Sequence, residues 1–93
     1  MRALREDEFK AREGEEFTLV LGDITLPFSL ARVRTLPDTG RDGGAFVLDW
    51  EGPSEPVLPQ AIYVLRQGEE QFEMFIVPVA QNSDGTKYEA VFN

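Results

Sequence analysis

The chain has 93 residues, 42% of them apolar, which is enough for one domain with one hydrophobic core. Its 17 acidic and 9 basic residues give a formal net charge of −8, which disfavours binding to nucleic acid or to anionic membrane surfaces. It has no cysteine and no histidine, which excludes disulfides, thiol catalysis, zinc–thiolate sites and histidine-based catalysis.

The N-terminal segment from Leu4 to Arg12 is highly charged, and Leu4 and Phe9 are its only large apolar residues. It predicts at most a short surface helix, ended by Gly14. The first eight residues contain no hydrophobic signal core, and no apolar run approaches the ~20 residues of a membrane span. We therefore expect a cytoplasmic protein.

Residues 17–21 and 24–28 are two apolar runs separated by Gly22-Asp23, which predicts a hairpin with a two-residue turn. Counting outward from the turn places Phe17 opposite Phe28 and brings nearly every large side chain onto one face. The second strand should continue to residue 35.

The alternation of the second strand changes phase at Leu30-Ala31, which predicts a bulge at that point. Pro27 has no N–H to donate, so the outer side of the strand should be unpaired near it. A turn-rich loop over residues 36–44 precedes a strand at 46–51. The register that satisfies both charge and packing pairs Arg32 with Glu51, Arg34 with Asp49 and Val33 with Trp50.

Residues 52–59 contain three prolines and predict an irregular crossover connection. Strands at 62–65, 72–79 and 86–93 follow, joined by turns at 67–70 and 81–85. The predicted registers pair Leu65 with Phe72, Tyr63 with Met74, Pro78 with Tyr88, and Ala80 with Thr86.

Six strands and a short N-terminal helix predict one all-β domain over residues 1–93, either a partly open antiparallel barrel or a two-layer sandwich. The strand at 72–79 is central and apolar on both faces, with Phe75, Val77 and Val79 on its second face. We expect a second layer of the domain to cover that face, with a partner or second copy as the alternative.

The C-terminal sequence resembles that of a known family. The segment Phe-x-Met-Phe-Ile-Val-Pro-Val at 72–79, followed by Asp84-Gly85 and the ending Tyr88-Glu89-Ala90-Val91-Phe92-Asn93, is similar to small bacterial proteins known only as a domain of unknown function. The resemblance covers most of the chain. It implies no activity and no functional residue, only a loose association with phage-tail-like genes.

Asp38-Thr39-Gly40 spells the active-site triplet of aspartic proteases, and 93 residues is about the size of a retropepsin-like subunit. Those enzymes place the aspartate after an apolar strand, whereas Pro37 precedes it here and the surrounding stretch has turn composition. A turn is the favoured interpretation of this triplet.

Two other acidic patterns have ordinary structural explanations. The stretch 82–85, Asn-Ser-Asp-Gly, resembles part of a calcium loop, but Ala80 stands where the first ligand would be, so a hairpin turn is favoured. Acidic clusters at 6–8, 13–16 and 69–73 could bind cations or a basic partner, but solvated faces are favoured.

These observations predict a non-catalytic β-module that binds protein or self-associates, and the family resemblance adds the expectation that it is an accessory of a phage-tail-like assembly. They predict no catalytic, cofactor-binding or metal-binding residue, and no nucleic-acid or membrane partner. Two alternatives stay open: an aspartic hydrolase using Asp38, and a barrel that binds a small ligand.

Overall fold

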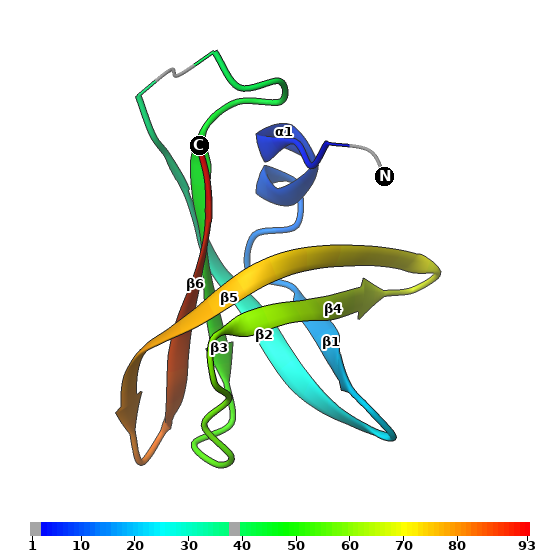
Figure 1. The fold of residues 1–93 in the computed structure, drawn as a ribbon, viewed down its shortest axis with the longest axis vertical. Helices are drawn as coiled ribbons and strands as arrows, with labels where there is room; N and C mark the ends of the chain where they lie inside the picture. Colours follow the sequence, from blue (N-terminus) through cyan, green and yellow to red (C-terminus); the bar gives the residue numbers. More distant parts are fainter. Residues whose placement is uncertain (1–2, 38–39) are drawn as a thin grey trace.

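A computed structural model describes residues 3–37 and 40–93. It is a closed six-stranded antiparallel barrel with the strand order β1-β2-β3-β6-β5-β4 and one short helix (Figure 1). The elements are α1 (Glu6–Lys10), β1 (Glu16–Leu21), β2 (Ile24–Thr35), β3 (Phe46–Gly52), β4 (Ala61–Gln67), β5 (Glu70–Asn82) and β6 (Gly85–Phe92). The all-β prediction is confirmed, and the barrel rather than the sandwich is the architecture.

The first hairpin has the predicted register. Leu21 pairs with Ile24 and Phe17 with Phe28, so the two-residue turn at Gly22-Asp23 fixes the alignment of β1 and β2. On its other side, β2 pairs with β3 only from Ser29 onward. The edge beside Pro27 is therefore unpaired, as predicted.

The predicted bulge in β2 is present, between Leu30 and Arg32. Phe28 and Leu30 are buried before it, and Val33 is buried after it, so inward positions change from even to odd numbers. In a regular strand without this bulge, Arg32 would point into the core like Leu30, because side chains alternate along a strand. The bulge therefore turns the arginines of β2 outward.

The predicted register between β2 and β3 is wrong by two residues. Arg32 pairs with Asp49 instead of Glu51, and Val33 pairs with Leu48 instead of Trp50. The long loop between these strands does not fix their alignment, and a shift by two keeps every side chain on its expected face. Trp50 is fully buried and lies opposite Leu30.

The pairing of β4 with β5 is as predicted, with Leu65 opposite Phe72 and Tyr63 opposite Met74. Pro78 also pairs with Tyr88 as predicted. A bulge between Pro78 and Ala80 then shifts the register, so Ala80 pairs with Lys87 and not with Thr86. The strands extend to Asn82 and from Gly85, which shortens the predicted five-residue loop to a tight turn.

One end of the barrel is closed by α1, whose Phe9 is fully buried. Its ring lies 5.0 Å from that of Phe72 and 6.2 Å from that of Phe46, between residues of β5 and β3. The backbone N–H of Glu6 donates to Gly43 O at 2.9 Å and attaches the helix to the loop before β3. The predicted helix is present, but it is more than a surface element, because its Phe9 is part of the core.

The crossover between β3 and β4 reaches the core at Leu58, which is buried. The backbone N–H of Leu58 donates to Tyr88 Oη at 3.0 Å, and Tyr63 Oη donates to Pro59 O at 2.6 Å. Both tyrosine hydroxyls thus have a hydrogen-bond partner, as buried phenols usually do. Burial raises the pKa of Tyr63, and the nearby Tyr88 raises it further.

A single packed core fills the barrel. Phe17, Phe28, Phe46, Trp50 and Phe72 are all buried, and Phe92 is partly buried against them. The expected second layer over Phe75 is absent from the described residues, because the barrel wall is one sheet thick and the outer face of β5 is exposed. Apolar residues on both faces of β5 therefore do not mean burial on both faces.

Candidate functional site

The outer wall of β4, β5 and β6 carries an exposed apolar surface. Ile62 on β4 and Phe75 on β5 lie directly opposite each other, and they are 68% and 51% exposed. Val79 on β5 and Val91 on β6 are also about half exposed. We call these four residues, Ile62, Phe75, Val79 and Val91, the outer apolar patch.

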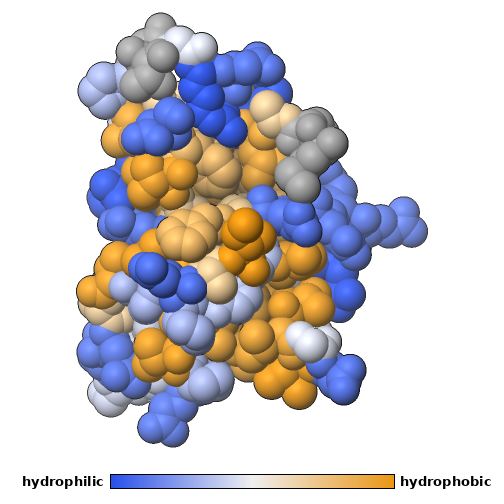
Figure 2. All heavy atoms as spheres, viewed as in Figure 1, coloured by the Kyte–Doolittle hydropathy of each residue, from blue (hydrophilic) through white to orange (hydrophobic). Residues whose placement is uncertain are grey.

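Strand alternation explains why Ile62, Phe75 and Val91 share one face, and Val79 lies further along β5 at its bulge. Tyr63, Met74 and Ala90 point into the core, so their neighbours along each strand point outward. Figure 2, drawn from the same side as Figure 1, shows apolar residues across the middle of this face and charged residues around much of its edge. Exposed apolar clusters with polar rims are typical of contact surfaces.

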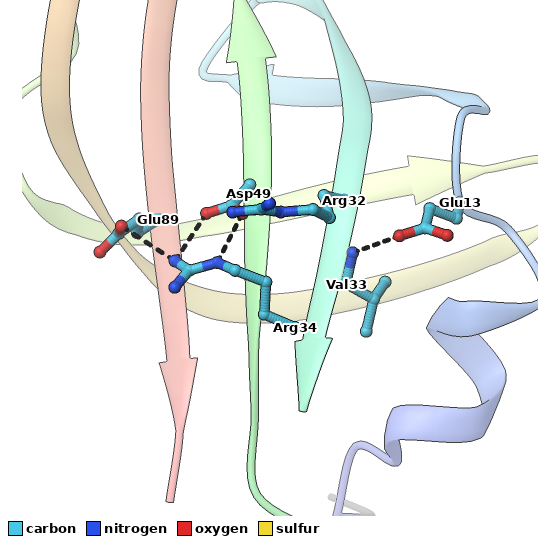
Figure 3. Close-up of polar contacts among 6 residues, drawn as sticks. All are labelled: Glu13, Arg32, Val33, Arg34, Asp49 and Glu89. Carbon is cyan, nitrogen blue, oxygen red and sulfur yellow. Dashed lines mark hydrogen bonds and ion pairs between the residues drawn. The ribbon is translucent and has the colours of Figure 1, made fainter. Parts of the chain in front are cut away.

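A charged network lies on the neighbouring outer wall of β2, β3 and β6 (Figure 3). Arg34 donates to Asp49 through Nε at 2.7 Å and Nη2 at 2.9 Å, and Nη2 also donates to Glu89 at 3.1 Å. Arg32 Nε donates to Asp49 Oδ2 at 3.3 Å. Asp49 is therefore the common acceptor of two arginines from β2.

The network changes the acid–base properties of its members. The hydrogen bond from Arg34, reinforced by the positive charges of Arg34 and Arg32, lowers the pKa of Asp49 despite its partial burial. The hydrogen bond to Asp49 is also the main cause of the raised pKa of Arg34. Asp49 and Arg34 are therefore both charged at neutral pH, as an ion pair requires.

A surface groove of about 490 Å³ lies along this network. Its lining has three basic and three acidic residues, together with Ala31 and Val79 from the bulges of β2 and β5. The charged residues are Arg32, Arg34, Asp49, Glu51, Lys87 and Glu89. Because these charges balance and largely bind one another, the network's evident role is to join β2, β3 and β6.

Comparison with known proteins gives one match. Residues 4–92 match the family model described as Domain of unknown function (DUF6916). The chain belongs to the DUF6916 family. The family assignment confirms the resemblance to a domain of unknown function that the sequence suggested. No similar protein was found among the curated proteins or the solved structures.

The protease triplet of this DUF6916 member cannot be placed, because Asp38 and Thr39 lie outside the described residues. The stretch resembling a calcium loop forms the hairpin turn that was favoured. Its Asn82 Oδ1 accepts a hydrogen bond from the backbone N–H of Asp84 at 2.8 Å. Across residues 3–37 and 40–93, no group of three or more potential ligands could hold a metal ion.

Several residues of the acidic clusters have structural roles. Glu8 accepts a hydrogen bond from the backbone N–H of Arg5 at 2.7 Å and caps α1. Glu13 accepts from the backbone N–H of Val33 at 2.7 Å, so a carboxylate satisfies a donor on the edge of β2 (Figure 3). Glu70 pairs with Arg12. In the part of the chain that the structure describes, no helix is long and apolar enough to cross a membrane.

Sequence reasoning singled out Phe75 and Val79 but missed Ile62 and Val91, the two other residues of the outer apolar patch. Ile62 was treated as an ordinary strand residue, although its predicted register already placed it opposite Phe75. Val91 belonged to a strand whose outer face had not been examined. The signal that could have revealed the patch was the row of outward positions across β4, β5 and β6, traced through the registers.

Proposed function

We propose that this protein is a non-catalytic protein-binding module and that the outer apolar patch is its contact surface. The observation that carries the proposal is the cross-strand pair Ile62 and Phe75, both more than half exposed on the outside of a folded barrel. Exposing two large apolar side chains side by side is unfavourable in water, and a protein surface of matching shape would remove them from it.

The core of the barrel is filled, which favours binding at the outer surface and argues against a small ligand bound inside the barrel. Trp50 lies 5.0 Å from Phe17, ring to ring, and 6.4 Å from Phe28, and the ring of Tyr88 lies 4.9 Å from that of Phe28. These aromatic contacts occupy the space that a small ligand would need. In the groove on the outer wall, most of the charged side chains already bind one another.

A finer proposal comes from the resemblance of the C-terminal motif Tyr88 to Asn93 to small bacterial proteins associated with phage-tail-like genes. We propose that the module is a cytoplasmic accessory of such an assembly in a bacterium. The net charge of −8 supports a protein partner over nucleic acid or an anionic membrane. The neighbourhood of the gene is the direct test, since a position away from structural or secretion genes would remove the reason for this proposal.

Affinity capture from the native host tests the general proposal. The baits are the wild type, the double variant Ile62→Ser with Phe75→Ser, and Ile24→Ser. Ile24 is a matched control because it is 54% exposed but lies beside the β1–β2 turn. We expect a host protein that the wild type and the control capture and that the double variant loses. Identical recoveries from all three baits, together with a strict monomer in light scattering, would contradict the proposal.

A further inference from the structure

We infer that the occupant of the outer apolar patch is a segment of another protein that combines apolar and cationic side chains. This inference rests on the proposed function and adds the chemistry of the partner. Phe75 is its apolar anchor, and the carboxylate of Glu73 is the acceptor for its positive charge. The two residues lie two positions apart on β5, so their side chains are on the same outer face.

Glu73 is available for such a contact. It is exposed, it lies opposite the apolar residue Val64, and no ion pair joins it to another described residue. Arg66 on β4 lies opposite Gln71, and the structure shows no salt bridge from it to Glu73. An unpaired carboxylate beside a large exposed aromatic ring would repel an anionic partner and attract a cationic one.

The balance of charge favours a partner of opposite sign over a second copy of this chain. Each copy carries a formal charge of −8, so a symmetric pair would bring two like-charged molecules together. A patch-to-patch dimer would also bring a second Glu73 into the contact region. A cationic partner removes both costs and gains attraction at long range.

The salt dependence of binding separates the two occupants. Association with a cationic segment weakens as salt screens the attraction between opposite charges. Association with a second copy strengthens, because salt screens the repulsion between like charges. The sign of the salt effect therefore identifies the occupant without knowledge of the natural partner.

Two synthetic peptides of equal length and leucine content serve as probes, one alternating leucine with lysine and the other leucine with glutamate. Each is titrated into isotope-labelled full-length protein and followed by NMR. We expect the lysine peptide to perturb signals of Ile62, Phe75, Val79 and Val91, and to bind at least about tenfold more tightly than the glutamate peptide. Its affinity should fall as salt rises from about 0.05 to about 0.5 M.

Three variants test the assigned residues. Phe75→Ser should weaken the lysine peptide by about tenfold or more, and Glu73→Gln by about three- to tenfold with a smaller salt effect. Ile24→Ser should leave binding unchanged. All three positions are exposed, so the fold should survive each change, and the NMR spectrum of each variant checks this.

Equal binding of the two peptides, unchanged binding by Glu73→Gln, or shifts away from the patch would overturn the inference. Self-association that strengthens with salt and is lost in Phe75→Ser would assign the patch to a second copy. None of these results removes a patch-dependent partner found by affinity capture, so the inference can fail while the proposed function stands.

Discussion

Asp49 and Glu89 lie directly opposite each other on β3 and β6, although both are acidic. Like charges at opposite positions of a sheet destabilise it. Arg34 resolves the conflict by donating to both carboxylates. It reaches them because the bulge at Ala31 places the arginines of β2 on the outer face. The bulge and the acidic pair are therefore parts of one arrangement.

Removing Arg34 should leave the repulsion between Asp49 and Glu89 uncompensated. We expect Arg34→Ala to lower the free energy of unfolding by about 1–2 kcal/mol at neutral pH, since it deletes three charged hydrogen bonds and leaves two carboxylates opposed. Arg32→Ala is the control and should cost about 0–1 kcal/mol, because its side chain is largely exposed and makes one long contact. Urea titrations of both variants measure the difference, and equal losses would contradict the assigned role.

The acid limb of the stability curve should report the lowered pKa of Asp49. Its folded-state pKa lies below the ordinary value of 3.8, so the folded state binds fewer protons than the unfolded chain in this range. The resulting stabilisation is present above the ordinary pKa and is lost as pH falls through the folded-state pKa. The stability advantage of the wild type over Asp49→Asn should therefore shrink in acid. An advantage that stays constant from neutral pH to acid would be inconsistent with this linkage.

Two substitutions of Trp50 should have very different effects. Trp50→Ala removes a fully buried side chain and should cost about 3–5 kcal/mol. Trp50→Phe keeps a ring in the core and removes Nε1, a buried donor without a hydrogen-bond partner among the described residues. Losing that donor offsets part of the lost packing, so we expect a cost of about 1–2 kcal/mol. Similar midpoints for both variants in denaturant would show that the indole N–H contributes more than the structure indicates.

The dependence of stability on pH in the alkaline range should reflect the raised pKa of Tyr63. Burial raises its folded-state pKa above the ordinary value of 10.0, so the neutral phenol is favoured in the barrel. The stabilisation is complete below the ordinary pKa and is lost as pH rises toward the folded-state pKa. Tyr63→Phe should cost about 1 kcal/mol at pH 7, because it loses the hydrogen bond to Pro59 O. Above about pH 10 the gap between variant and wild type should narrow, which thermal melts across this range would measure.

The parts of the fold that the sequence predicted correctly are those fixed by local geometry. The two-residue turn at Gly22-Asp23 leaves one register for β1 and β2. The phase change at Leu30-Ala31 likewise marks the bulge through residue pattern alone. Between β2 and β3 the long loop sets no alignment, so the register depended on matching charges and was wrong by two residues.

The exposure of the outer face of β5 could not be predicted from the sequence, for a different reason. An apolar residue such as Phe75 has the same pattern whether a second sheet or only solvent lies over it. Only the closure of the six strands into one ring shows that the described residues form no second layer over this face. Phe9 shows the reverse case, since it is fully buried in the core although the other residues of α1 are charged.

The place of β6 between β3 and β5 has a consequence for how the barrel forms. β6 is the last of the six strands along the chain, yet it is the strand that joins the two halves of the ring. During synthesis, β1 to β5 can pair only as β3-β2-β1-β4-β5, an open sheet with its edges at β3 and β5. Such edges can pair with other chains, so the nascent domain is most vulnerable to aggregation just before β6 emerges from the ribosome.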